Sequence, residues 1–438
     1  LSYSYRNHFT LNVNGRFDAS NKFGSRSNER FLPVWSVSGS WNLQENILRN
    51  VEFISELRLR GSFGIQGNML EDQSPNLIIK QGTIDPIYNE NVSSIARYPN
   101  PNLRWEETQQ LDGGLEVGFF KSRLSMEFSV YSKKTTDCFT TVRVSSVNGV
   151  SGHSYIMNGG DLNNSGYSIS LSATPVKTKD FQWNVRLNFS TNKNKVVSLL
   201  GQDTDGDGKE DDLVASGLFI GESLGTIYDY EVEGIWQLAD KENGTIMKGF
   251  YPGTYKIKDQ NGDGEITAGE DRVILGHKEP AYMMGISNDF SYKGFELRFF
   301  INTIQGGKNG YRSKIAKPDY IGKSIGNAEN LSWLTAYDYW SPRNPNAKFA
   351  TAWLSPTVDT NRMQNRSFVR LQDVSLSYNF DQRWTKKLGV SNLRLFISGQ
   401  NLLTFTGWDG WDPEAGIGFT TDSYPVMRTY AFGIDLTF

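Results

Sequence analysis

Cysteine and histidine are scarce in this sequence, and long apolar runs are missing. The single cysteine, Cys138, excludes an intramolecular disulfide and any metal site built from several cysteines. The three histidines, His8, His153 and His277, are far apart in the chain. No run of about 18 apolar residues occurs, so no transmembrane helix is predicted. Lys and Arg number 45 against 48 Asp and Glu, a balance that argues against nucleic acid as a partner.

Proline is also infrequent, with 14 residues, whereas 13% of the residues are aromatic and 43 are glycine. This mixture is typical of an all-β chain with many strands, and it excludes disorder, coiled coil and collagen. A length of 438 residues fits two or three soluble domains or one large barrel. No signal peptide is recognisable, and Leu1–Tyr5 looks like the end of a strand, so we expect a piece of a longer protein.

Strict alternation of apolar and polar residues dominates the chain. In one strand the apolar positions are Phe181, Trp183, Val185, Leu187 and Phe189, and in the last they are Tyr430, Phe432, Ile434, Leu436 and Phe438. Because successive side chains of a strand point to opposite sides, each such strand has one apolar and one polar face.

About twelve long strands are predicted, at roughly 9–20, 30–43, 54–66, 105–119, 123–137, 161–175, 181–194, 280–292, 295–305, 366–380, 392–404 and 426–438. Most have about 11–15 residues, longer than the 5–6 usual in globular sheets, whereas a strand that crosses a bilayer needs about 9–11. Short turns alternate with long polar segments at 67–104, 138–160, 195–279, 306–365 and 405–425. We therefore predict an all-β transmembrane antiparallel β-barrel with long extracellular loops. A soluble β-sandwich or adhesin is the alternative.

The outward-facing apolar residues would contact lipid and the polar residues would line a lumen, which explains the mean hydropathy of only −0.48. Aromatic residues near the strand ends fit the girdles of such barrels. One short helix is predicted at about 329–340, inside a long loop.

An acidic motif matches the twelve-residue calcium loop position by position. Its ligands would be Asp259, Asn261, Asp263, Glu265, Thr267 and Glu270, with Gly264 at the sharp turn. We predict a Ca²⁺ site here, and the alternative is an Asx-rich turn closed by its own hydrogen bonds. A second acidic run, 203–212, lacks the bidentate ligand at position twelve and is interpreted as a solvated loop tip, with a metal site as the alternative.

Aromatic residues of the loops are candidates for stacking on sugar rings. They are Trp333, Tyr337, Trp340, Trp353, Trp408 and Trp411. The alternative is that they pack the loops together or line a partner interface. No arrangement typical of a catalytic triad or a metalloprotease is present, so we expect no enzyme activity.

Five segments together resemble the C-terminal part of the SusC/RagA family of TonB-dependent outer-membrane transporters. They are Asn102–Glu106, Tyr255–Gly264, Tyr337–Ala347, Phe368–Tyr378 and Gly399–Glu414. The resemblance covers residues 1–438 as one portion of the barrel. It departs from the family at 163–167, where an acidic residue is common near Tyr167. Family barrels have 22 strands and a plug, so the 12–13 strands expected here imply that the plug and the first strands are absent.

The resemblance implies a function and several partners. The transporter would lie in the outer membrane of a Gram-negative cell, surrounded by outer-membrane lipid, and would import glycans with energy from the TonB–ExbB–ExbD complex. A SusD-like surface lipoprotein would act as a lid, in a dimer of transporter–lid pairs. Import of oligopeptides by the same mechanism, or passive diffusion through a porin, is the alternative. The terminal Phe438 resembles an assembly signal for the barrel.

Overall fold

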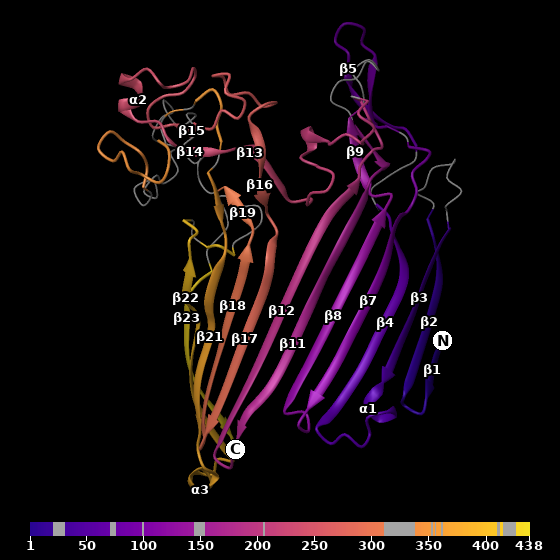
Figure 1. Ribbon diagram of the computed structural model, residues 1–438, viewed down its shortest axis with the longest axis vertical. Coiled ribbons are helices and arrows are strands. Elements are labelled where there is room, and N and C mark those ends of the chain that lie inside the picture. The colour runs from indigo at the N-terminus through magenta and orange to yellow at the C-terminus, as the bar shows by residue number, and fades with distance from the viewer. Residues whose placement is uncertain are drawn as a thin grey trace.

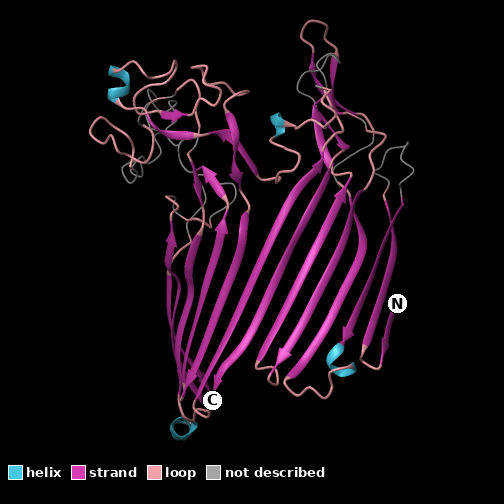
Figure 2. Cartoon of the chain, in the orientation of Figure 1, coloured by secondary structure: helices cyan, strands magenta, loops and turns pink. Residues whose placement is uncertain are grey.

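The computed structural model describes residues 1–20, 31–70, 76–98, 100–143, 154–204, 206–310, 338–351, 354, 356–360, 362–409, 412–414 and 426–438. One antiparallel sheet of 13 strands makes up the body of the molecule, and consecutive strands of the sheet are neighbours along the chain (Figure 1). Helices are few and short (Figure 2). In the described part, no helix is long and apolar enough to cross a membrane.

The strands of the large sheet follow in the order in which they pair. They are β1 (Ser2–Tyr5), β2 (Phe9–Ala19), β3 (Phe31–Asn42), β4 (Ile54–Asn68), β7 (Glu106–Phe119), β8 (Leu124–Thr136), β11 (Asp161–Lys177), β12 (Phe181–Ser198), β17 (Pro280–Tyr292), β18 (Phe295–Gly306), β21 (Phe368–Asn379), β22 (Asn392–Thr406) and β23 (Thr429–Thr437).

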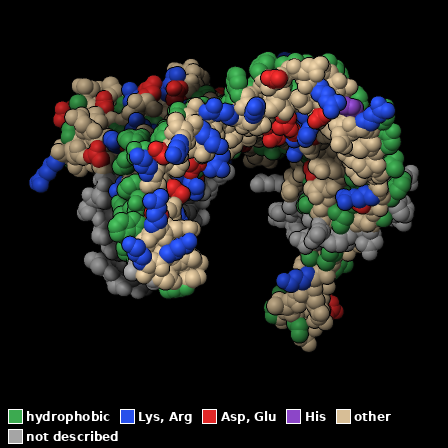
Figure 3. Space-filling view, turned by 90° about the horizontal axis from the view of Figure 1, so that it is seen from below, with side chains coloured by type: hydrophobic (Ala, Val, Ile, Leu, Met, Phe, Trp, Pro, Cys, Tyr) green, Lys and Arg blue, Asp and Glu red, His purple; other side chains and the backbone are tan. Residues whose placement is uncertain are grey.

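The predicted all-β antiparallel fold is confirmed, and the twelve predicted strands are the twelve long strands of the sheet. The stub at the N-terminus forms the thirteenth strand, β1. β1 and β23 are the two edges of the sheet, and within the described residues they do not pair with each other. The sheet curves into an open arch, with charged side chains gathered under its crown (Figure 3). The total of 22 strands stays a prediction.

The convex side of the sheet is apolar, because alternate positions of every long strand carry large hydrophobic residues. Phe17, Leu111 and Leu376 on three different strands are 78%, 58% and 44% exposed. Such exposure fits lipid contact better than a surface in water. Asn288 is a polar exception on this face, and its side-chain oxygen accepts a hydrogen bond from Trp183 Nε1 at 3.2 Å.

Aromatic rings gather on the convex side near the short turns, as predicted for a girdle. Trp183 stacks on Phe290 with ring centroids 5.6 Å apart, and Phe295 lies 4.5 Å from Tyr378. Both pairs stand within a few residues of a turn. Amphipathic rings at this height are typical of the boundary between acyl chains and headgroups.

A β-bulge in β21 moves the apolar face from odd to even positions. Leu371 pairs with Ile301, but the next paired residue on β21 is Asp373, opposite Phe300, so Gln372 is the extra residue. Before the bulge Arg370 shares the polar face, and after it Asp373 does. The alternation of apolar and polar residues is therefore interrupted once in this strand.

The connections have the predicted asymmetry. Tight turns, together with the short helices α1 (Leu43–Asn46) and α3 (Gln382–Thr385), join the strands at one end. At the other end the loops carry small two-stranded sheets that the sequence did not predict. These are β5 (Ile78–Ile84) with β6 (Asn91–Arg97), β9 (Phe139–Arg143) with β10 (Ser154–Asn158), β13 (Thr226–Tyr230) with β16 (Arg272–His277), β14 (Val232–Ile235) with β15 (Tyr255–Ile257), and β19 (Lys308–Gly310) with β20 (Met363–Asn365).

The longest loop has a hydrophobic core of its own. Tyr230, Trp236, Phe250 and Ile257 are buried together, and Val358 from the next long loop packs against them. Helix α2 (Leu238–Glu242) starts with a capping box on Gln237. The helix predicted at about 329–340 lies almost wholly outside the described residues.

Candidate functional site in the lumen face and the outward loops

The concave face of β4, β7 and β8 carries a network of ion pairs. Arg60 Nη1 donates to Glu116 Oε1 at 3.1 Å, and Arg58 Nη1 donates to Glu116 Oε2 at 3.3 Å. Arg60 Nη2 also donates to Ser129 Oγ at 2.8 Å and to Glu127. The charges of this wall are thereby largely neutralised among themselves.

A glycine lets Arg60 reach across an entire strand. Arg60, Gly114 and Ser129 occupy one register row on β4, β7 and β8. A Cβ atom added to Gly114 would collide with the Arg60 side chain. The missing side chain therefore makes room for the guanidinium to span β7.

A second long side chain crosses a glycine one strand further along the sheet. Tyr131 on β8 crosses Gly166 on β11 and donates its hydroxyl hydrogen to Asn192 Oδ1 on β12, at 2.8 Å. A second charge network follows, in which Asp289 accepts hydrogen bonds from Arg186 Nη2 at 2.9 Å and from Arg298. The wall is thus held by polar contacts across three strands at a time.

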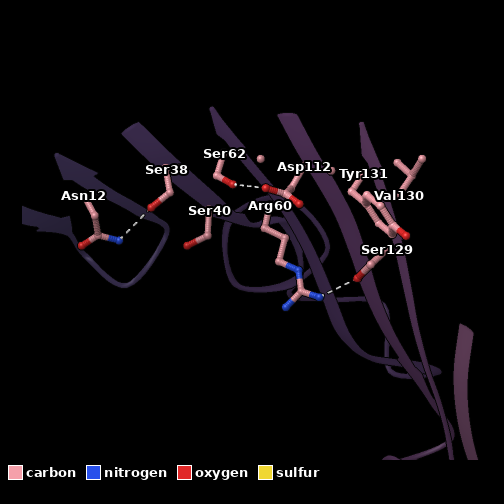
Figure 4. Close-up of a pocket in the computed structure, with 12 residues that line it drawn as sticks. Asn12, Ser38, Ser40, Arg60, Ser62, Asp112, Ser129, Val130 and Tyr131 are labelled. Atoms are coloured by element: carbon pink, nitrogen blue, oxygen red, sulfur yellow. Dashed lines mark hydrogen bonds between the residues drawn. The ribbon is translucent and has the colours of Figure 1, made fainter. Parts of the chain in front are cut away.

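A cleft of about 440 Å³ opens on the concave face between β2 and β8 (Figure 4). Hydroxyl and amide side chains line most of it, together with one carboxylate and one guanidinium. The polar side chains are Asn12, Ser38, Ser40, Arg60, Ser62, Asp112, Ser129 and Tyr131. Asp112 accepts hydrogen bonds from Ser62 Oγ at 3.0 Å and from Gln110 Nε2 at 2.9 Å. Nowhere in the described ranges does a Lys or Arg form an ion pair with Asp112. The cleft can accept and donate several hydrogen bonds to a neutral polyhydroxylated molecule.

Two of the six predicted sugar-stacking residues can be placed, and both are buried. Trp340 is 6% exposed, covers Gly253 and donates from Nε1 to Gln237 Oε1 at 2.9 Å. Trp408 is also 6% exposed, with the Arg366 guanidinium 5.8 Å from its ring centroid. This burial is the packing role that the sequence left open, and it leaves no exposed ring face for a sugar in this arrangement. The other four, Trp333, Tyr337, Trp353 and Trp411, lie outside the described residues.

A buried ion-pair cluster that the sequence did not predict joins two of the resemblance segments. Arg370 and Asp412 have side chains only 3% and 5% exposed, and Arg370 Nη2 lies 2.6 Å from Asp412 Oδ1. Arg370 Nη1 lies 2.6 Å from Glu414 Oε2. Local sequence patterns do not predict a contact between two residues so far apart in the chain. The one sequence feature that links the two residues is that both lie in segments that carry the family resemblance.

The predicted calcium loop lies between β15 and β16 and is closed by its own hydrogen bonds. Asp259 accepts from the backbone N–H groups of Gly262 and Gly264, at 2.7 and 2.8 Å. Asn261 Nδ2 donates to Asp263 Oδ2 and Glu270 Oε2, at 3.1 Å each. Glu265 and Thr267 follow in the same loop, and Thr267 Oγ1 lies 3.4 Å from Glu270 Oε2.

These contacts match the alternative interpretation of the loop as an Asx-rich turn closed by its own hydrogen bonds. Among the residues that the structure places, no group of three or more His, Cys, Asp or Glu side chains is arranged to hold a metal ion. In the loop, an amide group of Asn261 stands between the carboxylates. Binding of Ca²⁺ would require this amide to turn its oxygen inward, and the calcium site stays a prediction.

Several groups outside the large sheet have shifted pKa values with identifiable causes. Hydrogen bonds from Gln260 and Lys258 lower the pKa of Glu231, and burial raises the pKa of Tyr255. Burial, and then the negative charge of Glu106, raise the pKa of Cys138 to about 12. The only thiol of the sequence is therefore protonated and poorly nucleophilic at neutral pH. Phe438, the predicted assembly signal, follows β23 and is 87% exposed, and its role stays a prediction.

Known proteins with similar sequences are TonB-dependent receptors. The TonB-dependent receptor P3 of Formosa agariphila is 32% identical over 469 residues, which cover 100% of this chain and 45% of the relative. The TonB-dependent receptor SusC of Bacteroides thetaiotaomicron is 27% identical, with 100% and 43% covered. This chain thus spans about half the length of the curated relatives it matches.

Solved structures agree on the fold. The RagAB peptide transporter matches with a TM-score of 0.75 and 24% identity, over 100% of this chain and 47% of that one. The closed state of the RagAB peptide importer gives a TM-score of 0.77. The family model described as TonB dependent receptor-like, beta-barrel, matches residues 1–402. The chain therefore belongs to the TonB-dependent receptor β-barrel family of outer-membrane proteins, within which its relatives include SusC.

Proposed function

We propose that this chain forms the C-terminal part of the wall of an energised importer that carries neutral oligosaccharides across the outer membrane. The observation that carries the proposal is the cleft on the concave face. Ser38, Ser40 and Ser62 line it beside the Asp112 carboxylate, which has no cationic partner in the described ranges. A carboxylate and several hydroxyls suit the hydroxyl groups of a sugar.

The internal pairing of the charges supports a neutral cargo. Arg60 is engaged by Glu116, Glu127 and Ser129, so it is not a free anion-binding group. A peptide with charged termini would have to displace such pairs, at the cost of desolvating them. Because Trp340 and Trp408 are buried, the support for a sugar cargo comes from the polar concave wall and not from the aromatic residues of the loops.

The proposal includes the partners expected from the resemblance. A SusD-like lipoprotein would rest on the outward loops, in a dimer of transporter–lid pairs, and the TonB–ExbB–ExbD complex would supply energy. The packing of the two longest loops supports the proposed lid. Their shared core around Trp236 and Phe250 would give a lid an ordered surface on which to rest.

The test is uptake by cells that carry the full-length transporter. We expect uptake of fluorescent neutral oligosaccharides that is lost without TonB and reduced several-fold by Asp112→Ala. Asp18→Ala is the matched control, because Asp18 pairs with Arg16 on β2, outside the cleft. Uptake of oligopeptides in preference to sugars would overturn the cargo assignment. Uptake that persists without TonB would favour a porin.

A further inference from the structure

The end of the sheet with the short turns is basic. Four consecutive turns, from β7 to β22, carry eight exposed Lys or Arg residues and two acidic ones, Asp180 and Asp381. We call the eight basic residues the basic rim: Lys121, Arg123, Lys177, Lys179, Lys293, Arg383, Lys386 and Lys387.

The turns of the basic rim form one continuous edge. The backbone N–H of Thr174 donates to Arg123 O at 2.7 Å, which joins the first two turns. The N–H of Lys293 donates to Asp180 O at 3.3 Å, and that of Asn379 to Gly294 O at 2.8 Å. The four turns that carry the basic side chains are therefore adjacent to one another along the perimeter of the wall.

Most of this charge has no ion-pair partner among the residues that the structure describes. Lys293 lies 4.0 Å from Asp180 and Arg383 lies 3.7 Å from Asp381, both as exposed pairs. Within the described ranges, the other six basic residues of the rim form no ion pair. An unpaired line of like charges is unfavourable unless an anion from outside lies against it.

The charge of the chain is polarised along the strands. The longest outward loop, 199–279, contains eighteen Asp or Glu against seven Lys or Arg, although the whole chain has a net charge of only −3. The end with the short turns, which is the periplasmic end of such barrels, is thus basic, whereas the longest loop at the opposite end is acidic.

The basic rim adjoins exposed aromatic rings. Tyr292 is 49% exposed, with Lys293 Nζ 5.3 Å from its ring centroid. Trp384 is 69% exposed, with Lys387 Nζ 5.7 Å from its ring. Paired aromatic and cationic side chains at the edge of an apolar face lie at headgroup depth, where a phosphate can approach the cation while the ring contacts the acyl chains.

We propose that the basic rim binds the anionic phospholipid headgroups of the periplasmic leaflet and fixes the height and tilt of the wall in the membrane. The occupant follows from charge complementarity and from position, because the rim runs along the lipid boundary rather than forming one compact patch. An acidic periplasmic protein is the other conceivable occupant, but it would need a compact surface. The proposal is independent of the cargo.

The test compares the lipids that stay with the intact transporter in nanodiscs. Discs are formed from phosphatidylethanolamine with about a quarter phosphatidylglycerol, and the retained lipids are quantified by native mass spectrometry. The key variant is Lys121→Gln/Arg123→Gln/Lys177→Gln/Lys179→Gln. The matched control removes the same charge from the outward loop, as Lys209→Gln/Lys241→Gln/Lys248→Gln/Lys278→Gln.

We expect phosphatidylglycerol to be enriched around the wild type and the control, and about tenfold less so around the rim variant, since each basic residue near an anionic surface adds to binding. Added salt should reduce the enrichment in the wild type. The charge-conserving variant Lys121→Arg/Lys177→Arg/Lys179→Arg should retain it.

Equal enrichment in the rim variant and the wild type would overturn the proposal, as would an equal loss in the control. Capture of a periplasmic protein by the rim, with unchanged lipid retention, would assign the surface to that protein instead. If the fourfold variant does not assemble, the pairs Lys121→Gln/Arg123→Gln and Lys177→Gln/Lys179→Gln are measured separately, and each should lose part of the enrichment.

Discussion

Arg370 and Asp412 form a buried ion pair that ties the loop between β22 and β23 to the concave face of β21. Nη2 of Arg370 lies 2.6 Å from Oδ1 of Asp412, and Asp412 Oδ2 also accepts from the backbone N–H of Val426 at 3.0 Å. Thr404 Oγ1 accepts from Arg370 Nε at 3.0 Å. The pair thus fixes one loop with respect to two strands.

Removing one partner of this pair should strongly destabilise the wall. Asp412→Ala leaves the Arg370 guanidinium buried with only Glu414 as a counter-ion, and we expect a loss of about 3–5 kcal/mol in the free energy of unfolding. Asp409→Ala is the control, since it breaks the more exposed pair with Lys348 and should cost less than about 1 kcal/mol. The measurement is urea unfolding in lipid vesicles, and equal losses would contradict the role assigned to the cluster.

A side chain at Gly114 should displace Arg60. Gly114→Ala puts a Cβ atom where the Arg60 side chain lies, and we expect a loss of about 1–3 kcal/mol in unfolding free energy. Gly61→Ala is the matched control, because the nearest atom to its added Cβ is Asp112 O at 3.8 Å, an ordinary contact. The same vesicle assay serves here, and a Gly114 variant as stable as the Gly61 variant would show that Arg60 needs no such gap.

A positive charge should destabilise the protein by very different amounts at two neighbouring positions on β12. Leu187 pairs with Leu171 and Ile286 on the convex face, so Leu187→Lys should cost roughly 2–4 kcal/mol near the bilayer midplane. Asn188→Lys places the same side chain on the concave face, on the same side of β12 as Arg186, and should cost much less. Equal penalties in a refolding assay would mean that the two faces are wrongly assigned.

Calcium binding by the acidic loop after β15 can be tested directly by titration. If Ca²⁺ binds, isothermal titration of the full-length protein gives heat that Asp263→Ala abolishes, because Asp263 is one of the predicted ligands. Asp207→Ala, in the second acidic run, is the control and should leave that heat unchanged. Titration curves that do not differ between wild type and Asp263→Ala would assign the loop to its own hydrogen bonds.

The sequence predicted the large sheet well because a membrane strand repeats one rule, apolar outside and polar inside, over more than ten residues. The rule fails at Gln372, where a bulge exchanges the faces of β21, so that the apolar positions change from Val369 and Leu371 to Val374 and Leu376. Strand positions therefore depend on local periodicity, whereas the bulge depends on how two neighbouring strands pair.

The loops could be predicted much less well. Trp340 and Trp408 were candidates for sugar stacking, with packing of the loops as the alternative, and the sequence did not decide between the two. Both residues are buried, because a long loop can fold back on another loop and form its own core. The Arg60–Gly114–Ser129 row was not predicted either. Such rows depend on the register between strands, which alternation within one strand does not determine.

The most direct test of the account is a scan of solvent and lipid access along β12 in membranes. Single spin labels at residues 185–189, in a Cys138→Ser background, report collisions with oxygen from the lipid and with a water-soluble nickel complex. The account predicts high oxygen access at Val185, Leu187 and Phe189 and high nickel access at Arg186 and Asn188, alternating residue by residue. Uniform access along the strand, or apolar positions that neither reagent reaches, would contradict a wall with lipid on one side and a wet lumen on the other.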